Sequence, residues 1–389
     1  MVNSSNDNGL LPAGLGDILH PKAELQAKTI EKLIDVFSKF GYSRVKPPLV
    51  EYEDTLISNG LGQVLKDSTF RIMDPLSQKM MALRSDVTAQ ISRIASTRLS
   101  HLPRPLRLSY SGDVLRVKGD NFNMERQKTQ VGAELIGSES KFADAEIILV
   151  CLKALKSVGV EAITVDLNFP SLRKHLLRNV SKSLKNEINQ AIDIKDIQYL
   201  KNLKCDNLDI IIQFMESSGD HLNAIKYLKH IKLDQYLSNI RDYFLEVLDL
   251  VYINDDSSKL SIDILENRGF KYHTGLTFTV FSEHFKGEIA KGGRYKTSNE
   301  ETAAGCTIYT EKLNLKSNSI NDDQLVYIPY FSMNDAEFII QKGYKVVFGS
   351  NLNTNIEKEA FDMKCRYIWK NNLIVKLESQ YLKFRNFYE

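Results

Sequence analysis

The stretch from residue 105 to residue 137, PLRLSYSGDVLRVKGDNFNMERQKTQVGAELIG, constrains the fold more than any other part of the chain. Apolar and polar residues alternate on both sides of a short run that is rich in glycine, aspartate and asparagine. Alternation with a period of two is typical of β-strands, and that composition is typical of turns. The stretch therefore predicts a β-hairpin, with Gly112 interrupting its first strand.

The second strand of this hairpin has two chemically different faces. Val131, Ala133 and Leu135 lie on one face, and the other face carries Arg126, Lys128, Gln130 and Glu134. One interpretation is an amphipathic hairpin whose polar face lies in water. The mixture of cations, a carboxylate and an amide favours a second interpretation, a site for a small zwitterion.

Arginine is concentrated around the hairpin. The chain has sixteen arginines and thirty-five lysines, yet seven of the arginines lie between Arg84 and Arg126. A planar guanidinium group can bind an anion through two parallel hydrogen bonds, whereas a lysine acts as a point charge. The concentration therefore indicates recognition of an anionic group.

The composition makes several classes of protein improbable. The 389 residues carry a net charge of +2, and 43% are hydrophobic, as in ordinary globular proteins of two or three domains. A net charge this small does not indicate binding to nucleic acid or to an acidic membrane surface. The N-terminal stretch lacks the features of a secretory signal, and no apolar run is long enough to span a bilayer. Four scattered cysteines without a CxxC pair predict free thiols, no zinc site and a cytoplasmic location.

The remaining periodicities predict an α+β protein, an antiparallel sheet flanked by helices, rather than a doubly wound sheet. Helices are expected at 21–40, after an N-cap at Ser85 or Asp86, and at 141–155; a hairpin is expected at 70–83. We divide the chain into a first core part (1–170), an all-helical insertion (171–255), a second core part (256–320) and a small C-terminal α/β domain (321–389).

A second polar cluster lies within residues 261–283, SIDILENRGFKYHTGLTFTVFSE. Taken alone, Arg268 is typical of a surface arginine, and His273 of a hydrogen-bonded structural histidine. Together, in a glycine-rich strand–turn–strand setting, they become candidate ligand-binding residues. Gly292 and Gly293 are expected between strands, so they do not form a phosphate-binding loop.

Four motifs, in this order, resemble those of the histidyl-tRNA synthetase family of class II aminoacyl-tRNA synthetases. LRSDVTA (83–89) resembles LRPExTA, Arg116 with residues 126–134 resembles motif 2, residues 268–272 resemble the RGLDYY histidine motif, and GGRY (292–295) matches GGRY. The segment RGFKYHTG (268–275) is more similar still to RGYHYHTG of the synthetase-like regulatory subunits of ATP phosphoribosyltransferase. The resemblance covers about residues 9 to 315, and it implies a class II synthetase-like fold.

The sequence departs from the synthetase pattern where the resemblance implies contacts with ATP. Lys128 takes the place of the aromatic residue that stacks on adenine, and Met124 that of an arginine that meets the phosphates. Tyr309 to Lys312 replace Gly-Leu-Glu-Arg. A transferring group would lose most of its electrostatic partners. We therefore expect no cofactor and no aminoacylation activity.

The amino-acid pocket is retained, and the resemblance implies that its ligand is L-histidine. By resemblance, Asp86, Thr88 and Gln130 bind the α-ammonium group, Arg268 and Arg116 the carboxylate, and Glu134 and His273 the imidazole, with Tyr272 in the same motif. A ligand with one anion, one cation and a ring that both donates and accepts is strongly selected by such a pocket, because a wrong ligand leaves polar groups unpaired.

The resemblance thus implies a non-catalytic regulatory and activating subunit of ATP phosphoribosyltransferase, which binds histidine for feedback control of the first step of histidine biosynthesis. It implies a homodimer through the first helix and the Pro47-Pro48 strand, assembled with a short-form catalytic subunit into a hetero-octamer, and no tRNA or membrane partner. The alternatives are a divergent histidyl-tRNA synthetase or another adenylate-forming paralogue, and a regulator that binds RNA or a kinase.

Overall fold

The structure is a computed structural model that describes residues 10–57, 61–119, 124–267, 269, 272–313, 324–349 and 355–377. The chain forms two compact units, Met1–Leu315 and Lys316–Glu389.

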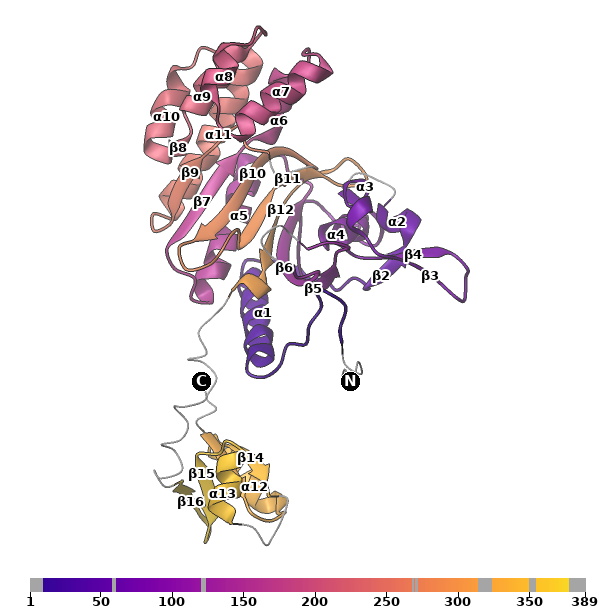
Figure 1. Ribbon diagram of the computed structural model, residues 1–389, viewed down its shortest axis with the longest axis vertical. Coiled ribbons are helices and arrows are strands. Elements are labelled where there is room, and N and C mark those ends of the chain that lie inside the picture. The colour runs from indigo at the N-terminus through magenta and orange to yellow at the C-terminus, as the bar shows by residue number, and fades with distance from the viewer. Residues whose placement is uncertain are drawn as a thin grey trace, which may run out of the picture. The chain divides into compact units, whose positions relative to one another are not determined.

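The first unit is built on a nine-stranded mixed sheet (Figure 1). Its strands, from one edge to the other, are β1 (Ser43–Arg44), β5 (Leu106–Leu115), β6 (Gln127–Ile136), β12 (Thr302–Tyr309), β11 (Ala290–Lys296), β10 (His273–Ser282), β7 (Ile163–Asn168), β9 (Lys259–Ile262) and β8 (Gly219–Asp220). Neighbouring strands are antiparallel except β1–β5 and β7–β9, which are parallel. The mixed sheet with flanking helices confirms the predicted α+β class.

Helices cover both faces of the sheet beside the central hairpin β5–β6. On one face, Leu33 and Phe37 of α1 (Lys22–Lys39) and Ile148 of α5 (Lys141–Ser157) pack in one core with the apolar side of β6. On the other face, α4 (Thr88–Thr97) packs Ile91 against Tyr110. The polar side of β6 therefore faces α4 and is covered by protein.

The hairpin is regular, and the prediction that Gly112 interrupts its first strand is wrong. β5 and β6 pair without a break from Leu106–Ile136 to Leu115–Gln127. A Cβ atom at residue 112 would lie 2.5 Å from Nη2 of Arg84. Arg84 donates from Nε to the carbonyl of Asp113 at 2.6 Å, so the glycine makes room for a buried arginine inside a continuous strand.

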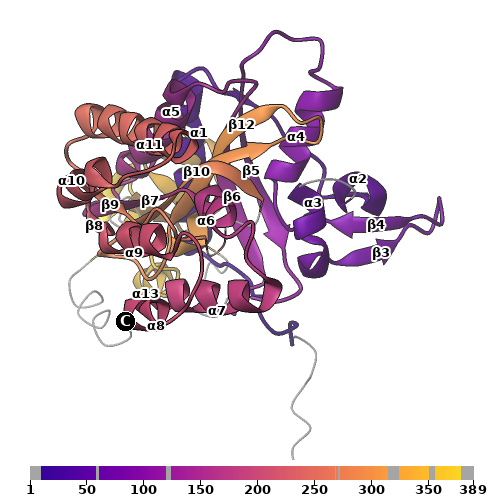
Figure 2. The same cartoon turned by 90° about the horizontal axis from the view of Figure 1, so that it is seen from above.

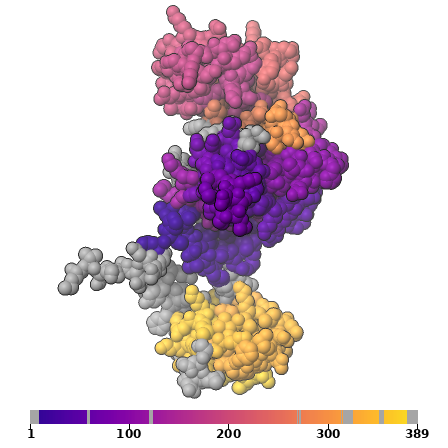
Figure 3. Space-filling model, turned by 90° about the vertical axis from the view of Figure 1, so that its right-hand side faces the viewer, coloured from indigo at the N-terminus to yellow at the C-terminus, as the bar shows by residue number. Residues whose placement is uncertain are grey.

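The predicted hairpin at 70–83 is present in a separate three-stranded sheet, with β2 (Val50–Tyr52), β4 (Met80–Leu83) and β3 (Arg71–Met73) in that order. It carries the short helices α2 (Glu53–Ile57) and α3 (Leu61–Val64), and η1 (Lys66–Ser68) follows. Figure 2 shows β3 and β4 projecting from the main sheet, and Figure 3 shows this part of the surface in violet.

The next helix starts later than the predicted N-cap at Ser85 or Asp86. Val87 is the N-cap residue of α4, and its backbone is already in the right-handed helical region. The Asp86 side chain nevertheless accepts a hydrogen bond from the Thr88 N–H at 2.9 Å. Asp86 therefore satisfies a helix-terminal donor from one position outside the cap.

The predicted insertion forms a group of helices at one end of the strands β10, β7 and β9 (Figure 1). They are α6 (Pro170–Leu176), α7 (Lys182–Asp193), α8 (Ile197–Lys201), α9 (Leu208–Glu216), α10 (His221–His230) and α11 (Gln235–Asn254). The insertion is not wholly helical, because Gly219 and Asp220 form β8 and pair with β9.

A buried ion pair between α5 and β11 of the core is contacted by Tyr243 of the insertion. Asp144 of α5 and Arg294 of β11 are 2% and 8% exposed, and their Oδ1 and Nη2 atoms lie 2.9 Å apart. Tyr243 of α11 donates its hydroxyl to the same carboxylate. Arg294 also donates to the carbonyls of Ser138 and Ser140, so its guanidinium group is bound on several sides.

The second unit contains a four-stranded sheet in the order β14-β13-β15-β16. Its elements are β13 (Leu325–Ile328), α12 (Met333–Gln341), β14 (Lys345–Phe348), α13 (Ile356–Asp362), β15 (Tyr367–Lys370) and β16 (Leu373–Lys376). Val326 packs with α12 and Tyr327 with α13, so the two helices cover opposite faces. The small C-terminal α/β unit expected from the sequence is therefore confirmed.

Candidate ligand-binding site

The two polar clusters of the sequence meet at a small cavity over β6, β12 and β11. The cavity is lined by Asp86, Thr88, Glu134, Tyr272, His273, Lys291, Gly292, Gly293, Tyr295, Gly305, Cys306, Thr307 and Tyr309. Five of these are residues that the sequence assigned to a ligand. Arg268, which the sequence also assigned to the ligand, lies outside the described residues.

Glu134 lies at the centre of this site and is only 1% exposed. Its carboxyl oxygens accept hydrogen bonds from Thr88 Oγ1 at 3.0 Å and from the Tyr295 hydroxyl at 2.8 Å. Gln130 beside it on β6 is fully buried. The interpretation of this face as the wet side of an amphipathic hairpin is therefore wrong, because both side chains are buried where α4 packs over β6.

Burial raises the pKa of Glu134 to about 8. The ordinary value is 4.5, so between these two pH values the folded state binds a proton that the unfolded chain releases. The stability from this proton is fully present below pH 4.5 and is lost as the pH rises through about 8. We expect the free energy of unfolding to fall by roughly 2–5 kcal/mol across this window because of Glu134.

Glu134→Gln, which does not titrate, is the control for this prediction. Urea unfolding at several pH values should give a flatter profile for the variant than for the unaltered protein. Equal slopes in the two proteins would contradict the assignment of a raised pKa to this group.

Glycines in three adjacent strands form the floor beneath Glu134. A Cβ atom at Gly305 would lie 1.7 Å from Glu134 Oε2, and one at Gly132 would lie 2.4 Å from the Tyr110 hydroxyl. Gly292 and Gly293 lie inside β11, so the prediction that they lie between strands is wrong. Their role is packing, since a Cβ atom at Gly292 would lie 2.2 Å from the Gly305 carbonyl oxygen.

Asp86 is held at the cavity by Gln130. The Gln130 amide donates to Asp86 Oδ2 at 3.1 Å and accepts from the Val87 N–H at 3.0 Å. Arg116 donates to the Ser85 carbonyl at 3.2 Å and lies 3.9 Å from Asp86 Oδ2. Gln130 and Arg116 do not line the cavity in the described part of the chain. They instead support the segment that presents Asp86.

Tyr272 and His273 close the cavity from the start of β10. Their rings stack with centroids 4.3 Å apart, and Tyr272 meets Tyr295 edge-on at 6.2 Å. Desolvation, assisted by the nearby Lys291 ammonium group, lowers the pKa of His273 to about 3. Its imidazole is therefore neutral at physiological pH and has one donor and one acceptor nitrogen.

Several lining residues were missed in the sequence, most importantly Lys291 and Tyr295. Both belong to β11, where the period of two puts Lys291, Gly293 and Tyr295 on the same face. The alternation of residues 290–296 is the signal in the sequence that indicates them. The strand is hard to recognise in the sequence because Gly292 and Gly293 are more typical of a loop.

Three of the seven arginines in this concentration form ion pairs within the protein. Arg93 is paired with Glu51 at 2.5 Å, Arg104 with Glu301 at 3.0 Å and Arg107 with Glu146 at 2.7 Å. These bidentate partners are carboxylates of the protein itself. The guanidinium groups are used to join elements far apart in the chain.

Tyr309, at the position where the synthetase pattern has a glycine that leaves room for adenine, is only 2% exposed. The ammonium groups of Lys128 and Lys291 lie 6.0 and 5.8 Å from the centroid of its ring. A bulky ring with two cations around it therefore stands where the resemblance puts the nucleotide base.

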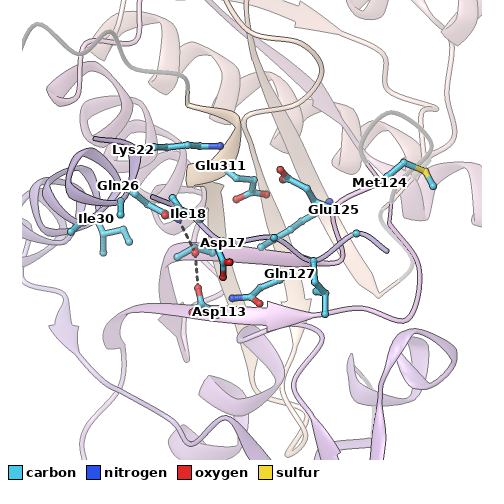
Figure 4. A pocket seen from close by; sticks show the side chains of 17 residues that line it. Asp17, Ile18, Lys22, Gln26, Ile30, Asp113, Met124, Glu125, Gln127 and Glu311 are labelled. Atoms are coloured by element: carbon cyan, nitrogen blue, oxygen red, sulfur yellow. Dashed lines mark hydrogen bonds between the residues drawn. The ribbon is translucent and has the colours of Figure 1, made fainter. Parts of the chain in front are cut away.

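A second cavity, of about 780 Å³, lies between residues 14–30 and the loop end of the β5–β6 hairpin (Figure 4). A hydrogen-bonded chain from Gln26 through Thr129 to Asp113 crosses it. Its lining includes Met124 and Lys128, both at ATP positions by resemblance, but also four carboxylates and only two lysines. An acidic lining repels phosphates, so this cavity does not suit ATP.

Within the described ranges, no helix is long and apolar enough to cross a membrane. The described His, Cys, Asp and Glu residues form no group of three or more that could hold a metal ion. All four cysteines are free, as predicted.

Comparison with known proteins gives consistent matches. The family described as histidyl-tRNA synthetase matches residues 14–313. The ATP phosphoribosyltransferase regulatory subunit of Rhodospirillum centenum is 37% identical over 375 residues, which cover 95% of this chain and 97% of that protein.

Two solved structures share the fold. An ATP phosphoribosyltransferase regulatory subunit/histidyl-tRNA synthetase from Bacillus halodurans has a TM-score of 0.78 at 20% identity, covering 92% of this chain and 97% of that one. A chain of an ATP phosphoribosyl transferase complex from Thermotoga maritima has a TM-score of 0.58 at 17% identity, covering 74% and 97%.

Proposed function

Since the chain belongs to the family of ATP phosphoribosyltransferase regulatory subunits, which are similar to histidyl-tRNA synthetases, we propose that its cavity binds L-histidine. Its function is that of a non-catalytic regulatory subunit of ATP phosphoribosyltransferase in histidine biosynthesis. The proposal adds that histidine bound here carries the feedback signal.

The observation that carries this proposal is the set of complementary groups around one small cavity. Asp86 supplies a carboxylate for an ammonium group, and Glu134 and His273 supply groups that can pair with a ring donor and acceptor. Tyr272 and Tyr295 supply aromatic surface. A free amino acid with an imidazole side chain matches these features.

A cofactor is not part of the proposal. Tyr309 stands in the adenine position and the second cavity is acidic, so the chain is poorly suited to ATP. The chain would act on the reaction only through its partner. Feedback requires that histidine binds more tightly to the inhibited assembly than to the active one.

We propose a short-form catalytic subunit of ATP phosphoribosyltransferase as the partner, in the cytoplasm. The assembly would contain homodimers of this chain, formed through α1 and the Pro47-Pro48 segment, within a hetero-octamer. The ATP phosphoribosyl transferase complex from Thermotoga maritima, whose chain has the same fold, supports the partner but not the stoichiometry of this proposal.

Co-expression with a short-form catalytic subunit tests the function directly. We expect the two chains to co-purify, the transferase to be active, and histidine to inhibit it. Glu134→Ala should weaken histidine binding by about 1–3 kcal/mol in calorimetry, because Thr88 and Tyr295 lose their acceptor and the ligand loses a partner.

Glu134→Ala should leave co-purification and basal transferase activity intact, which separates a ligand role from a scaffold role. Collapse of the assembly in this variant would make Glu134 structural. Histidine-dependent ATP–pyrophosphate exchange by the chain alone would instead establish the alternative, a divergent synthetase.

A further inference from the structure

Lys291 occupies an unusual place for a lysine. It lies in the centre of the nine-stranded sheet, paired with Thr279 of β10 on one side and with Thr307 of β12 on the other. Its side chain is 22% exposed. Holding an ammonium group largely out of water in a central strand is unfavourable unless a negative charge compensates it.

Described residues around Lys291, among them Glu288 and Asp86, favour the charged form of its ammonium group. Glu288 is an ion-pair partner of Lys291, with its Oε1 atom 3.7 Å from Nζ, and it is itself 34% exposed. The Tyr309 ring lies 5.8 Å away. Electrostatic interaction with the Tyr309 side chain holds the pKa of Lys291 above its usual value, so the group is positively charged at neutral pH.

Lys291 is also the one cation in the described lining of the cavity. His273 is neutral, and Arg116 does not line the cavity. Asp86, an acidic residue, lines the same cavity. Gly269 lies near Lys291, since a Cβ atom built there would be 3.8 Å from Nζ.

From this geometry we propose that Lys291 determines specificity in the cavity by pairing its ammonium group with the carboxylate of the bound amino acid. The inference rests on the proposed function, because it takes free histidine as the ligand. A zwitterion then lies between Asp86 and Lys291, with its cation toward one and its anion toward the other. An analogue without the carboxylate loses this second contact.

Calorimetry on the full-length chain with L-histidine and L-histidinol tests the proposal. L-histidinol keeps the ring and the ammonium group but has a hydroxymethyl group in place of the carboxylate. We expect the unaltered protein to prefer histidine, and Lys291→Ala to bind histidine about 10- to 100-fold more weakly while its affinity for histidinol changes little. The preference between the two ligands should largely disappear.

Lys128→Ala is the matched control. Its ammonium group lies at a similar distance, 6.0 Å, from the same Tyr309 ring, but it lines the second cavity. This variant should keep the preference for histidine. Lys291→Arg, which retains the charge, should keep most of the preference, and thermal unfolding of each variant shows whether it folds.

The possible failures are distinguishable. If the unaltered protein binds no histidine, the proposed function fails before the role of Lys291 is reached. If it binds histidine and Lys291→Ala retains the same preference over histidinol, the role of Lys291 is overturned while histidine binding stands. An equal loss of preference in Lys128→Ala would also overturn it, because the effect would then be general electrostatics around Tyr309.

Discussion

Replacing Gly305 with alanine is expected to abolish histidine binding at concentrations that saturate the unaltered protein. The new Cβ atom would lie 1.7 Å from Glu134 Oε2 and 2.4 Å from its Cδ atom, so the carboxylate must leave its place. This displacement breaks the buried hydrogen bonds that Glu134 accepts from Thr88 and Tyr295. Calorimetry should show an affinity loss of about 100-fold or more.

The same substitution should destabilise the fold by about 2–4 kcal/mol, since overpacking a rigid sheet cannot be relieved by backbone movement alone. Gly16→Ala is the control, because a Cβ atom there meets no atom within 4 Å. It should change neither the urea midpoint nor the affinity. Unaltered histidine affinity in Gly305→Ala would show that Glu134 has no role in the ligand site.

Gly305 also illustrates what the sequence can and cannot predict. Alternation in β6 correctly separated Glu134 from Val131, and it predicted a shared polar face. The need for a glycine opposite Glu134 could not be predicted, because it depends on which strand pairs with β6. That neighbour is β12, which begins 166 positions after β6 ends (302 minus 136).

The partners of the arginines could not be predicted from the sequence, for a different reason. Sequence reasoning found their concentration, but it could not decide between ligand anions and the protein's own carboxylates. Arg104 pairs with Glu301 and Arg107 with Glu146, so the partner is set by tertiary contact over long separations. Lys291 was missed for the opposite reason, since a glycine pair suggested a loop where the chain forms a central strand.

Removing one partner of the buried ion pair between Asp144 and Arg294 is expected to destabilise the fold strongly. Asp144→Ala should lower the free energy of unfolding by about 3–5 kcal/mol, because it leaves the buried Arg294 guanidinium group without its carboxylate. Tyr243 of α11 loses its acceptor in the same variant. Urea unfolding followed by circular dichroism measures the change.

A double variant tests whether the cost is that of an uncompensated charge. Asp144→Leu combined with Arg294→Met replaces the ion pair with apolar side chains, and it should recover most of the stability that Asp144→Ala loses. Tyr243→Phe, which removes only one hydrogen bond, should cost about 1 kcal/mol. Similar losses in the double variant and in Asp144→Ala would contradict this explanation and would assign the stability to packing.

Arg294 and the cavity residues share one short strand, which connects this prediction to the ligand site. Arg294 extends from β11 toward α5 and α11, while Lys291 and Tyr295 on either side of it line the cavity. If the ion pair holds β11 in register, Asp144→Ala should also weaken histidine binding, and the double variant should restore it together with stability. Recovery of stability without recovery of binding would show that the charge on Arg294 itself is needed to position Lys291 and Tyr295.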